Sequence, residues 1–297
     1  MGTLVSIDGH IVPPEAATIS IFDRGFLYGD SVYEVMRTYD GVPFELDHHL
    51  QRLEGSAARI SMAMPFSRSL LAEETLAAQG ASGNVDSYIR VVVTRGAGPI
   101  GLDIALAETP SRIIIVKSLE GMRPSPSVYE DGVQIALVGV RRNLRAAIDP
   151  KAKTGNYLNS VMALAEARAA GAYEAVMLDH RDFVTEGASS NVFVVVGDVI
   201  LTPPADAGIL VGVTRAIVLE VARGAGLRVL ELPLTQDTLC RDADEVFITS
   251  SVREIVPVTT VDSRRVGGGR PGPITRRIMS LFSEYVASYV KAHRARN

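Results

Sequence analysis

The sequence predicts an α/β fold (α+β by some schemes) of two domains, and three observations support this. Segments with alternating or continuous apolar residues, typical of strands, interleave with segments whose apolar residues recur every three or four positions, typical of helices. A length of 297 residues suits two domains. Residues 122–127, Met-Arg-Pro-Ser-Pro-Ser, have the composition of a linker. We expect an N-terminal α/β domain over 1–121 and a C-terminal α/β domain over 128–297.

In the N-terminal part, turn residues separate short apolar runs. Asp8-Gly9 predicts a hairpin over residues 3–12, and Asp40-Gly41 predicts a second hairpin that joins 32–39 to 42–44. Helical spacing of apolar residues predicts helices over 47–63 and 67–79. The remaining β-rich runs predict strands over 19–22, 88–94 and 112–117.

The C-terminal part continues the interleaved pattern. A helix is predicted directly after Tyr157, with an apolar face formed by Leu158, Val161, Met162, Ala165 and Ala169. Further helices are predicted over 214–223 and about 273–292. The predicted strands cover 133–139, 174–179, 191–196, 199–201, 228–232 and 245–250.

Composition limits the class of protein. A net charge of −4, from 30 basic and 34 acidic residues, gives no basic footprint for nucleic acid. No apolar run approaches the roughly 18 residues of a membrane span, and the N-terminus shows no secretory signal pattern. The single cysteine, Cys240, excludes an intramolecular disulfide. The five histidines show no metal-ligand spacing, so we expect no metal. We expect a cytoplasmic protein.

The segment Lys151-Ala-Lys-Thr-Gly-Asn-Tyr157 places two lysines just before a helix. A lysine held there in a buried position could form a Schiff base. A solvated basic turn explains the same residues, and the segment by itself favours this second interpretation.

Four other places could carry chemistry. Arg52 lies beside the apolar face of the 47–63 helix and is either a surface arginine or a clamp for phosphate or carboxylate. Gly212-Val213-Thr214 starts a helix, and this pattern fits either a plain helix cap or a site that binds an anion through backbone N–H groups. Ser250-Ser251 follows a strand and is either a plain turn or a set of donors. Glu186, in a Gly/Ser-rich loop, is either a surface acid or the partner of a pyridinium nitrogen.

Motifs of competing enzyme classes are absent or weak. The sequence contains neither Gly-x-Ser-x-Gly nor Gly-x-x-x-x-Gly-Lys-Ser/Thr. Gly-x-Gly-x-x-Gly occurs at Gly96–Gly101, but Pro99 and the residues after Gly101 do not open a helix, which argues against dinucleotide binding.

Taken in order, several segments resemble the class IV (fold-type IV) pyridoxal-phosphate aminotransferases, most closely the branched-chain amino-acid aminotransferases. The resemblance covers nearly the whole chain and implies the two-domain D-amino-acid aminotransferase-like fold. The matching segments are Leu27–Arg37, His49–Leu53, Tyr88–Gly96, Lys153–Asn159, Glu186–Phe193, Gly212–Arg215, Ala243–Ser250 and Gly272–Arg276.

The resemblance implies a role for each cofactor residue. Lys153, in the C-terminal domain, would form the Schiff base with pyridoxal 5′-phosphate and move the proton between the substrate Cα and the cofactor C4′. Lys153 stands three residues before Asn156, a spacing found in part of the family; others have the lysine four before, where this chain has Ala152. The implied cofactor contacts are Arg52, Val213, Thr214 and Ser251 for the phosphate, Tyr157 for the ring hydroxyl, Glu186 for the ring nitrogen, Leu210 for the ring face, and Ser250 as a further contact.

The implied substrate pocket is formed by Tyr28, Tyr33, Arg37, Tyr88, Arg90, Ser251 and Val252. Branched-chain enzymes usually read Phe-Glu-Gly where this chain has Tyr33-Glu34-Val35, and valine there also occurs in D-amino-acid and (R)-amine relatives. The segment after Thr94-Arg-Gly96 lacks the Arg-x-His-x-Phe pattern of typical D-amino-acid enzymes.

The resemblance therefore implies transamination of branched-chain L-amino acids with 2-oxoglutarate through a pyridoxamine form. The alternatives are a D-amino-acid or (R)-amine transaminase, an aminodeoxychorismate lyase or, outside these, a non-catalytic binding protein. The expected partners are amino-acid and 2-oxo-acid substrates and a second copy of the chain. The resemblance implies a dimer that shares its active site, with the Gly98–Leu102 loop expected to reach the neighbouring pocket.

Overall fold

The computed structural model describes residues 2–107 and 109–294, which divide into two compact units. Of the described residues, unit 1 contains those up to Arg123, the segment Ala152–Tyr157 and those from Tyr289 to Arg294. Unit 2 contains Pro124–Lys151 and Leu158–Ser288. The first passage between the units lies inside the expected linker. The segment that carries Lys153 groups with unit 1 instead of the C-terminal domain, because its backbone hydrogen bonds to a unit 1 strand.

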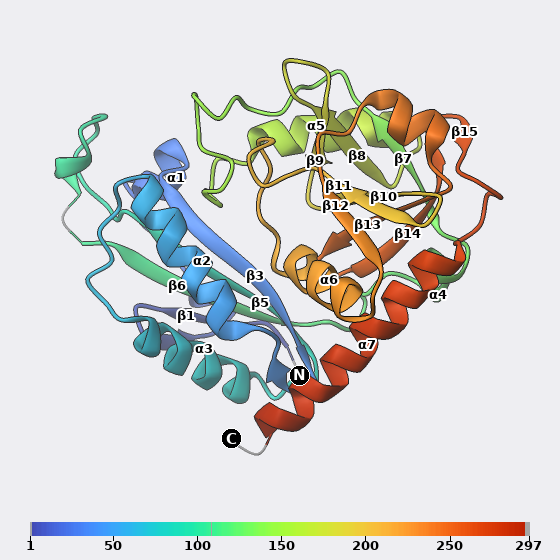
Figure 1. Ribbon diagram of the computed structural model, residues 1–297. Coiled ribbons are helices and arrows are strands. Elements are labelled where there is room, and N and C mark those ends of the chain that lie inside the picture. The colour runs from blue at the N-terminus through green and yellow to red at the C-terminus, as the bar shows by residue number, and fades with distance from the viewer. Residues whose placement is uncertain (1, 108, 295–297) are drawn as a thin grey trace. The chain divides into compact units, whose positions relative to one another are not determined.

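Unit 1 is an antiparallel sheet of six strands in the order β2-β1-β6-β5-β3-β4. Its strands are β1 (Leu4–Ile7), β2 (His10–Val12), β3 (Ser31–Tyr39), β4 (Val42–Pro43), β5 (Ser87–Thr94) and β6 (Ser111–Ser118). Helices α2 (Leu46–Arg59) and α3 (Arg68–Ser82) cover one face of it, and the short helix α1 (Arg24–Tyr28) precedes β3 (Figure 1). The core between sheet and helices includes Val32, Met36, Leu50, Leu53 and Ile89, all fully buried.

The alternation of β3 decides which side chains face this core. Successive residues of a strand point to opposite faces. Val32 and Met36 are fully buried among the core residues under α2 and α3, so Glu34 points to the same side. Tyr33, Val35 and Arg37 point to the other face of the sheet.

Unit 2 is a mixed sheet in the order β12-β11-β10-β13-β14-β7-β8-β9, with β15 paired to β14. Helix α5 packs on β7 and β8, α6 packs on β12 and β13, and α4 contacts β14. The strands are β7 (Val133–Leu137), β8 (Glu174–Leu178), β9 (Val184–Gly187), β10 (Asn191–Val196), β11 (Val199–Thr202), β12 (Arg228–Glu231), β13 (Glu245–Ser250), β14 (Glu254–Val261) and β15 (Arg264–Arg265). The helices are α4 (Pro126–Glu130), α5 (Leu158–Ala169), α6 (Val213–Gly224) and α7 (Pro273–Arg294), whose last residues from Tyr289 group with unit 1.

Three expectations about the elements were wrong. Residues 19–22 form no strand, and their apolar side chains are largely exposed. Glu186 lies in β9, a buried strand, and not in a loop. Helix α5 exists, but Leu158, Val161 and Met162 are more than half exposed, while Ser160, Ala163 and Ala167 are buried. Small side chains let α5 lie close to β7 and β8, so its larger apolar residues face outward.

None of the helices in the described part of the chain is both long and apolar enough to cross a membrane.

Candidate functional site

The backbone of Lys153 is fixed within unit 1 from two directions. Its N–H donates to Ser56 Oγ on α2 (3.0 Å), and its carbonyl accepts from the N–H of Tyr33 (2.9 Å). Gly155 continues this contact by donating its N–H to the carbonyl of Ser31 (2.7 Å), and a Cβ on Gly155 would lie 2.1 Å from Ser31 Oγ. The lysine segment therefore joins the start of β3, and any side chain at 155 would displace the Ser31 hydroxyl.

The amine of Lys153 lies among aromatic side chains. Its Nζ donates to the Tyr157 hydroxyl (3.1 Å) and lies 4.4 Å from the centre of the Tyr33 ring. The guanidinium of Arg90 also lies over the Tyr33 ring, at 3.9 Å. Burial, followed by the neighbouring Tyr157, raises the pKa of Tyr33, so this phenol stays neutral. The structure thus brings Lys153, Tyr157, Tyr33 and Arg90 together.

Four residues of the expected substrate pocket share one face of the unit 1 sheet. In the antiparallel pairing of β3 with β5, Val35 is opposite Arg90 and Arg37 is opposite Tyr88. Directly paired residues place their side chains on the same face, so Arg37, Tyr88 and Arg90 share the face of Tyr33. This is the face opposite α2 and α3.

Tyr28, also expected in the substrate pocket, contacts a different part of unit 1. Its hydroxyl accepts a hydrogen bond from the N–H of Gly101 (3.1 Å), and the guanidinium carbon of Arg24 lies 5.0 Å from the centre of its ring. Arg24 in turn donates to the carbonyls of Gly101, Leu102 and Asp103. Tyr28 is therefore joined to the segment that follows β5.

Arg52 belongs to a buried network of charged side chains between the unit 1 sheet and helix α2. Its Nε and Nη2 donate to the two carboxylate oxygens of Glu34, each at 2.7 Å, and His49 Nδ1 lies 2.7 Å from Glu34 Oε2. Burial alone would raise the pKa of Glu34, but the charge and hydrogen bonds of Arg52, helped by His49, lower it to about 2. Burial lowers the pKa of His49, against the opposing effect of Glu34. The bidentate pair fixes the plane of the Arg52 guanidinium.

In unit 2, Glu186 is buried and accepts several hydrogen bonds. Arg142 Nε donates to its Oε1 (2.8 Å), and the backbone N–H of Leu210 donates to its Oε2 (2.9 Å). Asn191 Nδ2 lies 3.4 Å from the same oxygen and donates to the Leu210 carbonyl at 2.8 Å. The carboxylate is held in one orientation at the start of β10.

The start of α6 lies beside the same asparagine. A Cβ on Gly212, the N-cap of α6, would lie 2.2 Å from Asn191 Oδ1, so only glycine fits there. The cap provides no side-chain acceptor for the first-turn N–H groups of Val213 and Thr214. Asn191 also pairs with Thr249 next to the end of β13. Glu186, Leu210, the start of α6 and Ser250 thus lie near the end of the unit 2 sheet where β9 and β13 finish and β10 begins.

The turn between β13 and β14 contains Ser251, Val252 and Arg253. Ser250, at the end of β13, accepts a hydrogen bond on Oγ from Arg253 Nε (3.1 Å). The turn closes with Glu254 in the left-handed region (φ 59°).

Sequence reasoning missed the residues that hold the expected ones. Glu34, itself in contact with His49, holds Arg52, Ser56 holds Lys153, and Arg142 with Asn191 holds Glu186. One signal was readable: Glu34 alternates with Val32 and Met36 in a strand, and an acid in such a buried position needs a cationic partner.

Each unit, taken by itself, carries groups of a kind that bind a planar pyridine with a phosphate. Unit 1 offers an amine beside a phenol and a fixed guanidinium, and unit 2 offers an oriented carboxylate and uncapped N–H groups. A carboxylate suits a protonated ring nitrogen, while an arginine and helix N–H groups suit a phosphate. In residues 2–107 and 109–294, no group of three or more His, Cys, Asp or Glu side chains could hold a metal ion.

Comparison with known proteins gives consistent results. Residues 31–261 match the family model of amino-transferase class IV. A putative branched-chain-amino-acid aminotransferase of Methanocaldococcus jannaschii is 39% identical over 94% of this chain and 95% of the relative. A D-alanine aminotransferase of Bacillus licheniformis is 35% identical over 96% of this chain and 97% of the relative. The structure of the T.th. branched-chain amino acid aminotransferase with pyridoxamine 5′-phosphate matches with a TM-score of 0.91 and 32% identity, covering 96% of this chain and 94% of that one.

Proposed function

Because the chain belongs to class IV of the aminotransferases and is a pyridoxal-phosphate-dependent enzyme of the fold-type IV class, we propose that it transfers the amino group of branched-chain L-amino acids to 2-oxoglutarate. The observation that carries the proposal is the Tyr33, Arg37, Tyr88 and Arg90 face beside the Lys153 amine. Arg90 offers a planar fork for a substrate carboxylate, while the aromatic rings offer apolar surface for an aliphatic side chain.

We assign the cofactor contacts as the family resemblance implies. Arg52, the N–H groups of Val213 and Thr214, and the Ser250–Ser251 turn would bind the phosphate. Tyr157 would donate to the ring hydroxyl, Glu186 would pair with the ring nitrogen, and Leu210 would pack on the ring. When bound, pyridoxal phosphate supplies an electron sink for the substrate Cα.

The contacts in the two units support specific roles. Lys153 Nζ, which is 3.1 Å from the Tyr157 hydroxyl, would carry the proton between the substrate Cα and the cofactor C4′. Arg142 and the Leu210 N–H keep the Glu186 carboxylate turned in one direction. Tyr28, Tyr33, Arg37, Tyr88, Arg90, Ser251 and Val252 would contact the substrate.

A D-amino-acid transaminase is the second candidate. The relative from Bacillus licheniformis has that activity in its name, and Val35 lies opposite Arg90 on the substrate face, where branched-chain enzymes usually have glycine. A valine side chain there narrows the space beside Arg90.

A panel of amine donors tests the substrate class. Each donor is mixed with the pyridoxal-phosphate form, and the conversion to the pyridoxamine form is followed by absorbance. We expect L-leucine to react about tenfold or more faster than D-alanine or (R)-phenylethylamine, because a pocket whose contacts fit one donor lowers the rate with the others by at least this factor. A faster reaction of D-alanine or (R)-phenylethylamine would overturn the assignment. Pyruvate release from aminodeoxychorismate would identify a lyase.

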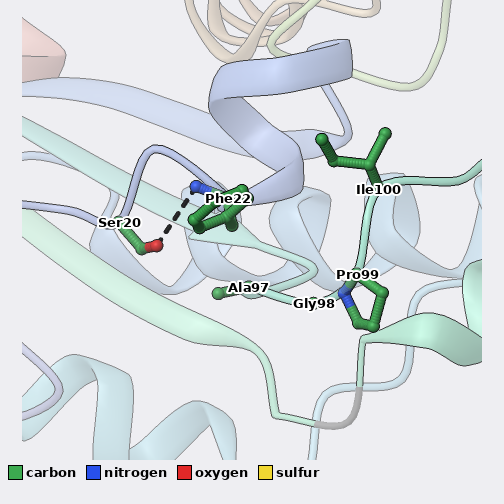
Figure 2. A pocket seen from close by; sticks show the side chains of 6 residues that line it. All are labelled: Ser20, Phe22, Ala97, Gly98, Pro99 and Ile100. Carbon is green, nitrogen blue, oxygen red and sulfur yellow. Dashed lines mark hydrogen bonds between the residues drawn. The ribbon is translucent and has the colours of Figure 1, made fainter.

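We also propose that the enzyme forms a homodimer in which the Gly98–Leu102 loop completes the partner's active site. In unit 1, Ile100 and Leu102 of this loop are 71% and 81% exposed, and Phe22 and Ile100 border an open hollow of about 620 Å³ (Figure 2). In unit 2, α5 exposes Leu158, Val161 and Met162. Soluble monomers rarely expose large apolar patches. The expected cytoplasmic location remains a prediction.

Replacing Val161 and Met162 together by aspartate tests the dimer. We expect light scattering to give the native protein the mass of a dimer. The average mass of the double variant should fall toward that of a monomer, because charged side chains on this face oppose its burial. Val85→Asp, at another exposed apolar position, is the matched control and should leave the mass unchanged. A monomeric native protein, or an unshifted double variant, would contradict this use of α5.

A further inference from the structure

Arg253 joins two turns at the end of the unit 2 sheet where β9 and β13 finish. Its Nε donates to Ser250 Oγ in the β13–β14 connection. Its Nη2 donates to Ser189 Oγ (2.9 Å) and to the Ser189 carbonyl (3.3 Å) in the β9–β10 connection. One guanidinium therefore connects the turn that follows β13 to the turn that follows Glu186.

A fully buried carboxylate holds this guanidinium. Glu174 on β8 has no exposed surface, and its Oε2 accepts from Arg253 Nη2 at 2.7 Å. The same oxygen accepts from the hydroxyls of Ser189 (2.9 Å) and Ser190 (3.3 Å), while Oε1 accepts the N–H of Ala175 (3.1 Å). A buried charge of this kind requires a cationic partner, and Arg253 supplies it. The Arg253 guanidinium is thereby fixed in position.

The contact on Ser250 also sets the direction of its hydroxyl. Because Arg253 Nε donates to Ser250 Oγ, the oxygen acts as acceptor on that side, and its own hydrogen points elsewhere as a donor. The turn ends at Glu254 in the left-handed region, which is unfavourable for a residue other than glycine. The hydrogen bonds of Arg253, the residue before Glu254, oppose the relaxation of this turn to a less strained conformation.

We propose that Arg253, held by Glu174, is a positioning residue that fixes the Ser250–Ser251 turn for the phosphate of pyridoxal phosphate. This inference rests on the proposed assignment of the phosphate to that turn. Arg253 acts through Ser250, and its effect is therefore specific to a ligand that carries the phosphate group.

The test compares pyridoxal phosphate with pyridoxal, which lacks the phosphate. Dissociation constants for both are measured by fluorescence titration of the apoprotein. For Arg253→Met we expect the affinity for pyridoxal phosphate to fall about tenfold or more, as for the loss of one well-oriented contact to a charged group. The affinity for pyridoxal should change less than about twofold. Arg253→Lys, which keeps the charge but not the planar fork, should recover only part of the loss.

Two further variants keep the test decisive. Glu174→Gln/Arg253→Met removes both charges, so it avoids an unpaired buried carboxylate and should show the same phosphate-specific loss. Arg228→Met breaks an exposed ion pair with Asp198 on the same unit and is the control that should change neither affinity.

An equal loss for both ligands, or no loss for either, in a double variant with native circular dichroism would overturn the proposal. A native protein that binds pyridoxal as tightly as pyridoxal phosphate would instead overturn the phosphate assignment in the proposed function, and the inference with it.

Discussion

Replacing Lys153 by alanine should abolish transamination and the covalent attachment of pyridoxal phosphate, whereas Lys151→Ala should leave both in place. Lys153 is held by Ser56 and Tyr33, and its amine contacts Tyr157. Lys151 belongs to unit 2, where its N–H donates to Asp149 Oδ1 (3.0 Å). We expect kcat of Lys153→Ala to fall by about 10³-fold or more, since positioned proton transfer alone typically contributes about 10²–10⁴-fold.

Borohydride reduction of the loaded protein, followed by peptide mass analysis, locates the attachment directly. The visible absorbance band of the bound cofactor and the rate with L-leucine are measured on the same samples. Attachment at Lys151, or a fully active Lys153→Ala variant, would transfer the role away from Lys153. Tyr157→Phe should keep the attachment and lose only the contact between its hydroxyl and the amine.

Replacing Glu34 by glutamine should destabilise the protein by about 3–5 kcal/mol, the usual cost of removing one partner of a buried ion pair. Glu34 has no exposed surface and holds both Arg52 and His49. The variant leaves the Arg52 charge without its carboxylate and releases the guanidinium plane, so the affinity for pyridoxal phosphate should fall as well. The free energy of unfolding is measured in urea.

Glu54→Gln is the matched control for this prediction. Glu54 pairs with Arg68 on the surface of α2 and α3, with both side chains about one third exposed. Such a pair typically contributes about 0–1 kcal/mol. If Glu34→Gln costs no more than Glu54→Gln, the buried network does not stabilise unit 1.

The same network predicts how stability depends on pH. The pKa of Glu34 is lower in the folded state than in the unfolded chain, where it is about 4.5. Its contribution is therefore complete above pH 4.5 and is lost as the pH falls toward about 2. The pKa of His49 is also lowered by folding, so the unfolded state takes up a proton first when the pH falls below about 6.5. The free energy of unfolding should decline as the pH falls below about 6.5. In Glu34→Gln, the part of this decline that occurs below pH 4.5 should be absent.

Local patterns predicted most elements of this protein. The alternation of β3, the Asp-Gly hairpins and the helical spacing of α2 are set by neighbouring residues, and they appear where expected. Two segments differ from what their neighbouring residues predict. Residues 19–22 have the composition of a strand, but they form none. Helix α5 has the predicted apolar spacing, but close packing on β8 buries Ala163 and Ala167 and leaves the larger apolar side chains exposed.

Lys151 and Lys153 lie in the same basic segment, and only the family resemblance distinguishes them at the level of sequence. The structure separates them physically: Lys153 is bound to β3 and α2, while Lys151 groups with unit 2.

Motifs that are local in the chain were enough to predict the family and the cofactor, and the residues proposed to bind the cofactor were chosen from the same motifs. The contacts that hold these residues depend on the folded structure. Glu34 reaches Arg52 across 18 positions, Arg142 reaches Glu186 across 44, and Arg253 reaches Glu174 across 79. Each pair exists because folding buries a charge, and a buried charge must find its partner wherever the chain brings one close.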